Sequence, residues 1–197
     1  TYYVYDGSGQ RIRKVTERAG GQVKDERLYL GGFELYRKHG AAPLARETLH
    51  ITDARQRIAL VETRTDTPAP QALIRYQLAN HTGSAALELD AGGRIISYEE
   101  YYPYGGTSYQ AGPDAAEVGL KRYRYAGMER DEESGFAYHQ ARYYLPWLGR
   151  WLSADPSGLR PGRNLYCFCH GRPITLGDVH GRDPVAVHHP LHVGREP

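Results

Sequence analysis

Short stretches of alternating apolar and polar side chains, separated by Gly, Asp and Pro, run through most of the chain. Residues 1–6 (TYYVYD) and 10–16 (QRIRKVT) flank an Asp-Gly-Ser-Gly segment, which is the pattern of a β-hairpin. Residues 26–37 (ERLYLGGFELYR) predict another strand pair, broken by two glycines. The chain is therefore expected to consist mainly of short strands.

The first hairpin pattern recurs further along the chain. In residues 87–98 the Asp-x-x-Gly spacing of Asp6 and Gly9 returns, and residues 52–61 hold a weaker echo in which Gln56 replaces the glycine. Aspartate can close such a turn through its own side chain, and glycine accepts a positive φ at no steric cost. This pattern favours an array of stacked hairpins, with a non-repeating β domain as the alternative.

Less regular segments separate and follow these units. Residues 65–71 (TDTPAPQ) predict a loop, and residues 99–106 lead from a strand into a Pro/Gly turn. Residues 109–119 are expected to be a loop with room for one short helical turn. The strand signal ends after Val179, and residues 182–197 predict a loosely held tail.

The composition supports a β-fold, and the charge balance argues against a nucleic-acid-binding protein. There are 17 Tyr against 3 Phe and 2 Trp, and tyrosine suits sheet faces that are partly hydrated. The 25 basic and 23 acidic residues are nearly balanced, so no concentrated basic surface for nucleic acid is expected. A mean hydropathy of -0.64 argues against a membrane-spanning helix. The chain opens at Thr1 without a signal segment, so we expect an internal or C-terminal piece of a longer protein.

A dense series of motifs begins at residue 122. It comprises Tyr-Ala-Gly (125–127), Asp-Glu-Glu-Ser-Gly (131–135), Ala-Arg-Tyr-Tyr (141–144), Gly-Arg-Trp (149–151), Asp-Pro-Ser-Gly-Leu (155–159) and Asn-Leu-Tyr (164–166). Earlier motifs are YLGGFELYR (29–37), NHTGSA (80–85) and SYEEYYPYG (97–105). The later series resembles the RHS-repeat-associated core domain of bacterial RHS/YD-repeat proteins. The earlier motifs resemble one branch of that family, the C component of insecticidal toxin complexes (Tc toxins).

The resemblance, which covers about residues 1–182, implies an all-β fold in which hairpin repeats form part of a hollow β-sheet shell, the RHS cocoon. It implies YD-type hairpin repeats over residues 1–120, a core-domain plug over residues 121–182, and the start of a variable region at residues 183–197. The implied partners are an upstream RHS shell or Tc B component, a C-terminal toxin as cargo, and the translocation component of the complex. The implied location is secreted, with no cofactor.

The resemblance also implies chemistry: the core domain resembles an aspartic protease that cuts its own chain and frees the enclosed toxin. The first family motif, Asp-Pro-x-Gly-Leu, matches fully from Asp155. The second aligns with residues 178–182, which keep Asp178 and the glycine but lose the proline and leucine. The family arginine corresponds to Arg142, and the implied cleavage lies between Arg182 and Asp183.

Two aspartates suit this reaction because neighbouring carboxyls cannot both ionise, so one holds a proton while the other activates water. Arg142 could orient one carboxylate, or simply stack on aromatic rings. Asp-Pro-x-Gly is also an ordinary turn sequence. Arg182 replaces an apolar residue that would fit a pocket, which leaves altered specificity, slow cleavage or a dead site open.

Other candidate sites are weaker. His180, His188, His189 and His192 lie close together, but a Pro-rich tail offers no fixed geometry for a metal. If their segment is a strand, Cys167 and Cys169 project from the same face, and we expect them to be core or wall residues and not ligands. The residues after Arg182 are too few for a toxin domain, so either the chain is cut short or it carries almost no cargo.

The alternative function is a non-catalytic RHS/YD scaffold for cell-surface adhesion or glycan binding through tyrosine-rich faces. An enzyme acting on an external small molecule finds no support, because no phosphate-binding glycine loop, metal signature or nucleophile elbow is present.

Overall fold

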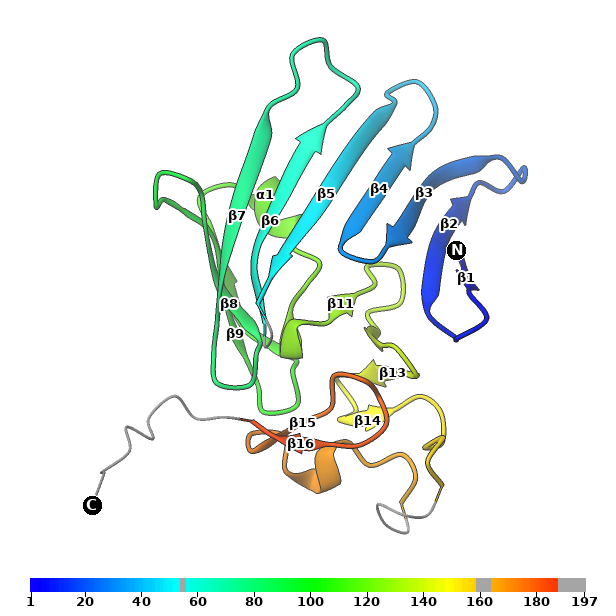
Figure 1. Ribbon diagram of the computed structural model, residues 1–197, viewed down its shortest axis with the longest axis vertical. Coiled ribbons are helices and arrows are strands. Elements are labelled where there is room, and N and C mark those ends of the chain that lie inside the picture. The colour runs from blue at the N-terminus through cyan, green and yellow to red at the C-terminus, as the bar shows by residue number, and fades with distance from the viewer. Residues whose placement is uncertain (54–55, 159–163, 188–197) are drawn as a thin grey trace. The chain divides into compact units, whose positions relative to one another are not determined.

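The computed structural model describes residues 1–53, 56–158 and 164–187, and in these the chain is almost entirely β-structure (Figure 1). One antiparallel sheet holds ten strands in sequence order, each hydrogen-bonded to the next. They are β1 (Tyr2–Tyr5), β2 (Arg11–Glu17), β3 (Val23–Leu30), β4 (Phe33–Lys38), β5 (Leu44–Thr52), β6 (Arg57–Arg64), β7 (Ala72–Ala79), β8 (Ala85–Leu89), β9 (Ile95–Tyr101) and β10 (Thr107–Ala111). The sheet is not closed, and the predicted all-β hairpin fold is confirmed.

One turn device recurs between these strands. Asp6 Oδ1 accepts hydrogen bonds from the backbone amides two and four residues further on, at 2.8 and 2.9 Å, and Gly9 takes a φ of +82°. Asp90 uses its Oδ1 in the same way, as the repeat in the sequence predicted. Asn80 does so with its amide oxygen, in a hairpin that the sequence reading did not single out. A local side-chain acceptor therefore sets several of the hairpin turns.

Two expectations about irregular segments are corrected. Tyr109, expected in a loop, lies in β10, because the Thr107–Ala111 backbone finds hydrogen-bond partners along β9. The expected helical turn follows as α1 (Ala115–Gly119). The predicted loose tail is ordered in part: β16 (Val185–Ala186) pairs with β15 (Leu176–Gly177), which satisfies backbone groups that a loose tail would leave to water. Residues 188–197 lie outside the described part.

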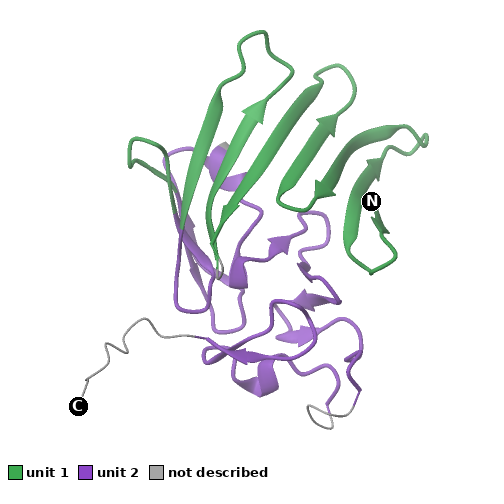
Figure 2. Cartoon of the chain, in the orientation of Figure 1, with its two compact units in different colours: residues 1–77, 88–96 green, residues 78–87, 97–197 purple. Residues whose placement is uncertain are grey.

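The chain divides into two compact units, one of residues 1–77 and 88–96 and one of residues 78–87 and 97–197 (Figure 2). After β10 and α1, the second unit continues through a 3₁₀ turn at Tyr125–Gly127. It then forms a four-stranded sheet of β11 (Glu129–Arg130), β12 (Ala137–His139), β13 (Arg142–Leu145) and β14 (Arg150–Trp151), a 3₁₀ turn at Cys169–Gly171, and the β15–β16 pair. Within the described residues, no helix combines the length and hydrophobicity that crossing a membrane requires.

Aromatic rings make the core of the second unit. Tyr144, Trp151 and Phe168 are buried, with ring centroids 4.1 Å apart for Tyr144 and Phe168 and 5.3 Å apart for Trp151 and Phe168. Cys169 is buried in the same cluster. It lies in a 3₁₀ turn, so the strand on which a shared face with Cys167 depended is not present here. Both thiols are free. The core role expected for Cys169 is confirmed.

Charged side chains are also buried in the first unit. Arg27 Nη1 lies 2.9 Å from Glu34 Oε2, and the same carboxylate accepts from His50 Nε2 at 2.7 Å. Arg75 Nε meets Glu62 Oε2 at 2.7 Å. Buried charges need such partners, since an unpaired ion would lose its hydration without compensation. This sheet therefore buries paired charges as well as apolar side chains.

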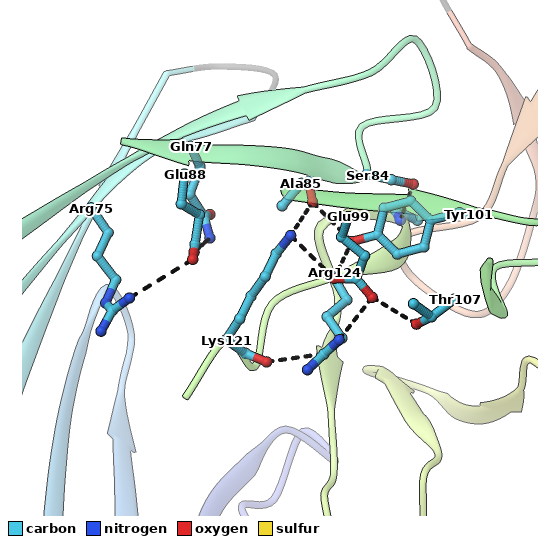
Figure 3. Close-up of polar contacts among 11 residues, drawn as sticks. Arg75, Gln77, Ser84, Ala85, Glu88, Glu99, Tyr101, Thr107, Lys121 and Arg124 are labelled. Atoms are coloured by element: carbon cyan, nitrogen blue, oxygen red, sulfur yellow. Dashed lines mark hydrogen bonds and ion pairs between the residues drawn. The ribbon is translucent and has the colours of Figure 1, made fainter. Parts of the chain in front are cut away.

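A second buried ionic group, in the second unit, joins β9 to the segment after α1 (Figure 3). Lys121 Nζ lies 3.1 Å from Glu99 Oε2, and both side chains are fully buried. Arg124 Nη1 and Thr107 Oγ1 each reach Glu99 Oε1 at 2.7 Å. Lys121 also donates to the Ala85 carbonyl. In this Lys121–Glu99–Arg124 cluster, the hydrogen bond from Arg124 to Glu99 connects two residues that are 25 positions apart in the sequence.

Candidate functional site

Arg142 begins β13, is buried among aromatic rings, and lies between the two predicted aspartates. Its Nη2 is 2.8 Å from Asp155 Oδ2 and 3.4 Å from Asp178 Oδ2. The guanidinium also lies over the Trp151 ring, 4.1 Å from its centroid. Both alternatives stated for this arginine, orienting carboxylates and stacking on a ring, therefore describe its contacts. The structure brings Asp155, Asp178 and Arg142 together.

Asp155 divides its two carboxylate oxygens between a turn and the arginine. Oδ1 accepts from the amide of Ser157 at 2.8 Å, while the Gly158 amide donates to the Asp155 carbonyl at 3.1 Å. Oδ2 faces Arg142. The Asp-Pro-x-Gly sequence is thus a turn, and the turn directs the carboxylate towards Arg142. Leu159, the last residue of that motif, lies outside the described residues.

Asp178 directly follows β15 and is almost completely buried. Its Oδ1 accepts from the Arg182 amide at 3.0 Å and its Oδ2 faces Arg142. Burial raises the pKa of Asp178, and the nearby charge of Asp155 adds to this, while the Arg182 amide and Arg142 oppose it. The protonated form of Asp178 is therefore reached at a higher pH than in an exposed aspartate.

His139 is a member of this site that sequence reasoning missed. It ends β12 and is completely buried, with its ring edge-on to Trp151 at 5.2 Å. Its Nδ1 lies 2.6 Å from the Asp178 carbonyl oxygen, so this nitrogen is the donor. Among the described residues Nε2 has no hydrogen-bond partner. The only sequence signal was its position three residues before Arg142.

Burial, together with the positive charge of Arg142, lowers the pKa of His139 to about 4, against 6.5 for an exposed histidine. Between these values the unfolded chain binds a proton that the folded chain does not, so stability falls as the pH drops from 6.5 to about 4. The expected loss is about 3 kcal/mol, from about 1.4 kcal/mol per pKa unit. Urea unfolding of wild type and His139→Gln across this range measures it. The variant should lack this part of the pH dependence, and parallel curves would contradict the assignment.

The predicted cleavage position lies beside the arginine. Arg142 Nε donates to the Gly181 carbonyl at 2.7 Å, and Nη2 reaches the Arg182 carbonyl oxygen at 3.5 Å, a long contact. The Arg182 carbonyl belongs to the Arg182–Asp183 peptide bond. Arg142 thus contacts this carbonyl as well as the two carboxyls, and Asp178 also binds the Arg182 amide. A cation and two carboxyls are groups that acid–base hydrolysis of an amide uses.

No metal site emerges from the described residues, where no three His, Cys, Asp or Glu side chains gather to hold an ion. His188, His189 and His192 lie outside the described part. His180 Nδ1 instead contacts Gln140 Oε1 at 2.9 Å.

The described residues form a β protein in which a sequential hairpin sheet is followed by an aromatic core where one arginine meets two motif aspartates. No family model matches the chain. The toxin subunits YenC2 and YenC1 of Yersinia entomophaga are 40% and 38% identical to it over 190 residues, 93% and 92% of this chain. The crystal structure of TcdB2-TccC3 without its hypervariable C-terminal region matches with a TM-score of 0.82 and 37% identity, over 91% of this chain and 9% of that one.

These matches confirm the resemblance predicted from the sequence. Over about nine-tenths of its length the chain is similar to Tc toxin C components, and its core segment is like their RHS core region. The chain spans about one fifth of the curated relatives, 20% of YenC2 and 19% of YenC1.

Proposed function

We propose that this chain is the C-terminal part of an RHS toxin-encapsulating shell, and that its core segment cuts its own chain between Arg182 and Asp183 to free a C-terminal toxin. The observation that carries the proposal is Arg142, whose guanidinium meets Asp155, Asp178 and the carbonyl of the predicted scissile bond. In the whole protein, the partners are an upstream shell or B component, the toxin as cargo, and the translocation component. We place the protein among secreted proteins. The proposed domains are hairpin repeats over residues 1–120, the core domain over residues 121–182 and the start of the variable region at residues 183–197.

The proposed reaction is an intramolecular aspartic proteolysis. Asp155, ionised and paired with Arg142, accepts a proton from a water that adds to the Arg182 carbonyl carbon. Arg142 stabilises the negative charge that develops on the carbonyl oxygen. Asp178, whose pKa is raised by burial, supplies the proton that the Asp183 nitrogen takes as the C–N bond breaks. The immediate products are a carboxylic acid at Arg182 and a free amine at Asp183, with Asp155 protonated and Asp178 ionised. The acid then passes its proton to the amine, which gives a carboxylate and an ammonium group, and Asp155 returns its proton to Asp178, so atoms and protons balance.

The test is to extend the chain after Pro197 with a foreign polar segment and to search by mass spectrometry for a new end after Arg182. Cleavage is expected in the wild type. It should be lost in Asp155→Asn, which keeps the size of the side chain and its oxygen for the turn but removes the charge. A folded Asp155→Asn variant that still cuts would refute the assigned pair.

The matched control is the double variant Val179→Pro with Arg182→Leu, which restores the family motif. If only this variant cuts, the shell and its protease site stand but this particular chain is inactive. If neither cuts, the self-cleavage proposal fails, and a non-catalytic RHS scaffold becomes the better description.

A further inference from the structure

The backbone of residues 178–182 is held by the turn that joins β12 to β13. His139 Nδ1 donates to the Asp178 carbonyl at 2.6 Å, and the Ala141 amide donates to the His180 carbonyl at 3.2 Å. Arg142 Nε donates to the Gly181 carbonyl at 2.7 Å. These three donors meet main-chain oxygens, which every amino-acid type carries. Two side chains of the segment are also held, because Asp178 contacts Arg142 and His180 contacts Gln140. The side chains of Val179 and Arg182 take no part in these contacts.

Gly181 differs from these positions, because the turn lies directly against its Cα. A Cβ built at this position would be 2.5 Å from the His139 carbonyl oxygen and 3.0 Å from the Arg142 nitrogen. Both are backbone atoms, so they cannot rotate away. The φ of Gly181 is +65°, which other residue types rarely adopt. This position therefore accepts glycine and excludes larger residues.

The side chains at the two altered motif positions lie at the surface. Val179 and Arg182 are exposed. Within the described part of the chain, the Arg182 side chain makes no hydrogen bond or ion pair, and only its backbone amide and carbonyl contact the site. In this structure, no hydrogen bond or ion pair at the site therefore depends on the side chain at position 182.

We infer that the site recognises residues 178–182 through their backbone, through the Asp178 and His180 side chains and through the absence of a side chain at Gly181. Recognition does not depend on the side chain at position 182. Gly181 is the specificity-determining residue, and His139 is a positioning residue that acts through the Asp178 carbonyl. The inference rests on the proposed self-cleavage, and it means that the departures from the family motif do not inactivate the chain.

The experiment measures cleavage rates in the extended chain after refolding from urea. Wild type, Arg182→Leu and Arg182→Ala should cut within about 3-fold of one another, whereas an apolar pocket would separate them by about 10–200-fold. Gly181→Ala should be slower by about 100-fold, the cost of misplacing the peptide bond by about 1 Å. Gly171→Ala is the matched control. Its φ is +74°, but nothing lies within 4 Å of the added Cβ, so it should share the backbone strain and keep the cleavage rate.

For His139, the test pair is His139→Asn, whose amide can replace the Nδ1 donor, and His139→Phe, which keeps the ring without a donor. Cleavage should be retained in His139→Asn and slowed in His139→Phe. The comparison holds when the two variants have equal midpoints of urea unfolding, because a loss of stability then does not explain the slower cleavage. The inference is overturned if Arg182→Leu cuts more than 10-fold faster than wild type, or if Gly181→Ala cuts at the wild-type rate. Either result would leave the proposed self-cleavage standing. If no variant cuts, including the double variant Val179→Pro with Arg182→Leu, both the inference and the proposed self-cleavage are wrong.

Discussion

Replacing Arg142 with methionine is expected to abolish self-cleavage and to lower the free energy of unfolding by about 3–5 kcal/mol at neutral pH. The substitution keeps an apolar side chain over Trp151 but removes the partner that Asp155 and Asp178 share. Removing one side of a buried ion pair leaves a charge without hydration or compensation, which costs more than the pair contributes. Urea unfolding gives the stability, and mass spectrometry of the extended chain gives the cleavage.

The pH dependence of this effect separates electrostatics from packing. The pKa of Asp178 is already raised by burial, and loss of Arg142 raises it further. A group with a raised folded pKa destabilises the fold as pH rises through that pKa, so the penalty should shrink as pH falls towards the ordinary value of 3.8. The control Arg142→Lys keeps a charge but loses the forked geometry. It should recover part of the stability but not the cleavage, and a penalty that is equal at all pH values would contradict this account.

Replacing Lys121 with methionine should produce a stability loss of similar size, about 3–5 kcal/mol, in a different part of the second unit. Lys121 and Glu99 are both fully buried, and the variant leaves Glu99 paired with Arg124 and near the charge of Arg130. The cations Arg124 and Lys121 overcome the burial that would otherwise raise the pKa of Glu99, so that its pKa lies below the ordinary value of 4.5. The Glu99 pairing therefore stabilises the fold above that value, and the contribution is lost as pH falls through the lowered pKa.

A double-mutant cycle isolates the pair. Glu99→Gln combined with Lys121→Met removes both charges, and it should cost clearly less than the sum of the single changes. Additive losses, measured by urea unfolding at neutral pH, would show that Lys121 acts through its contact with the Ala85 carbonyl or through packing instead.

Much of the fold could be predicted because its rules act between near neighbours in the sequence. The turn at Asp6 needs only a carboxylate and a glycine three residues later, and both are visible in the string. The same local rule gave the turn at Asp90. Strand β10 and the β15–β16 pair were missed because their short segments depend on a partner strand that local patterns do not identify.

For the candidate site, the sequence by itself supplied the motifs, and their resemblance to a known family pointed to Asp155, Asp178 and Arg142. Only the tertiary structure decided that His139 donates to Asp178, that a Cβ at Gly181 has no room, and that Lys121 is buried against Glu99. The physical reason is that these effects need atoms from distant parts of the chain. Hydrogen-bond reach, steric exclusion and the strength of a buried charge depend on what surrounds a residue in space, and no local pattern specifies those surroundings.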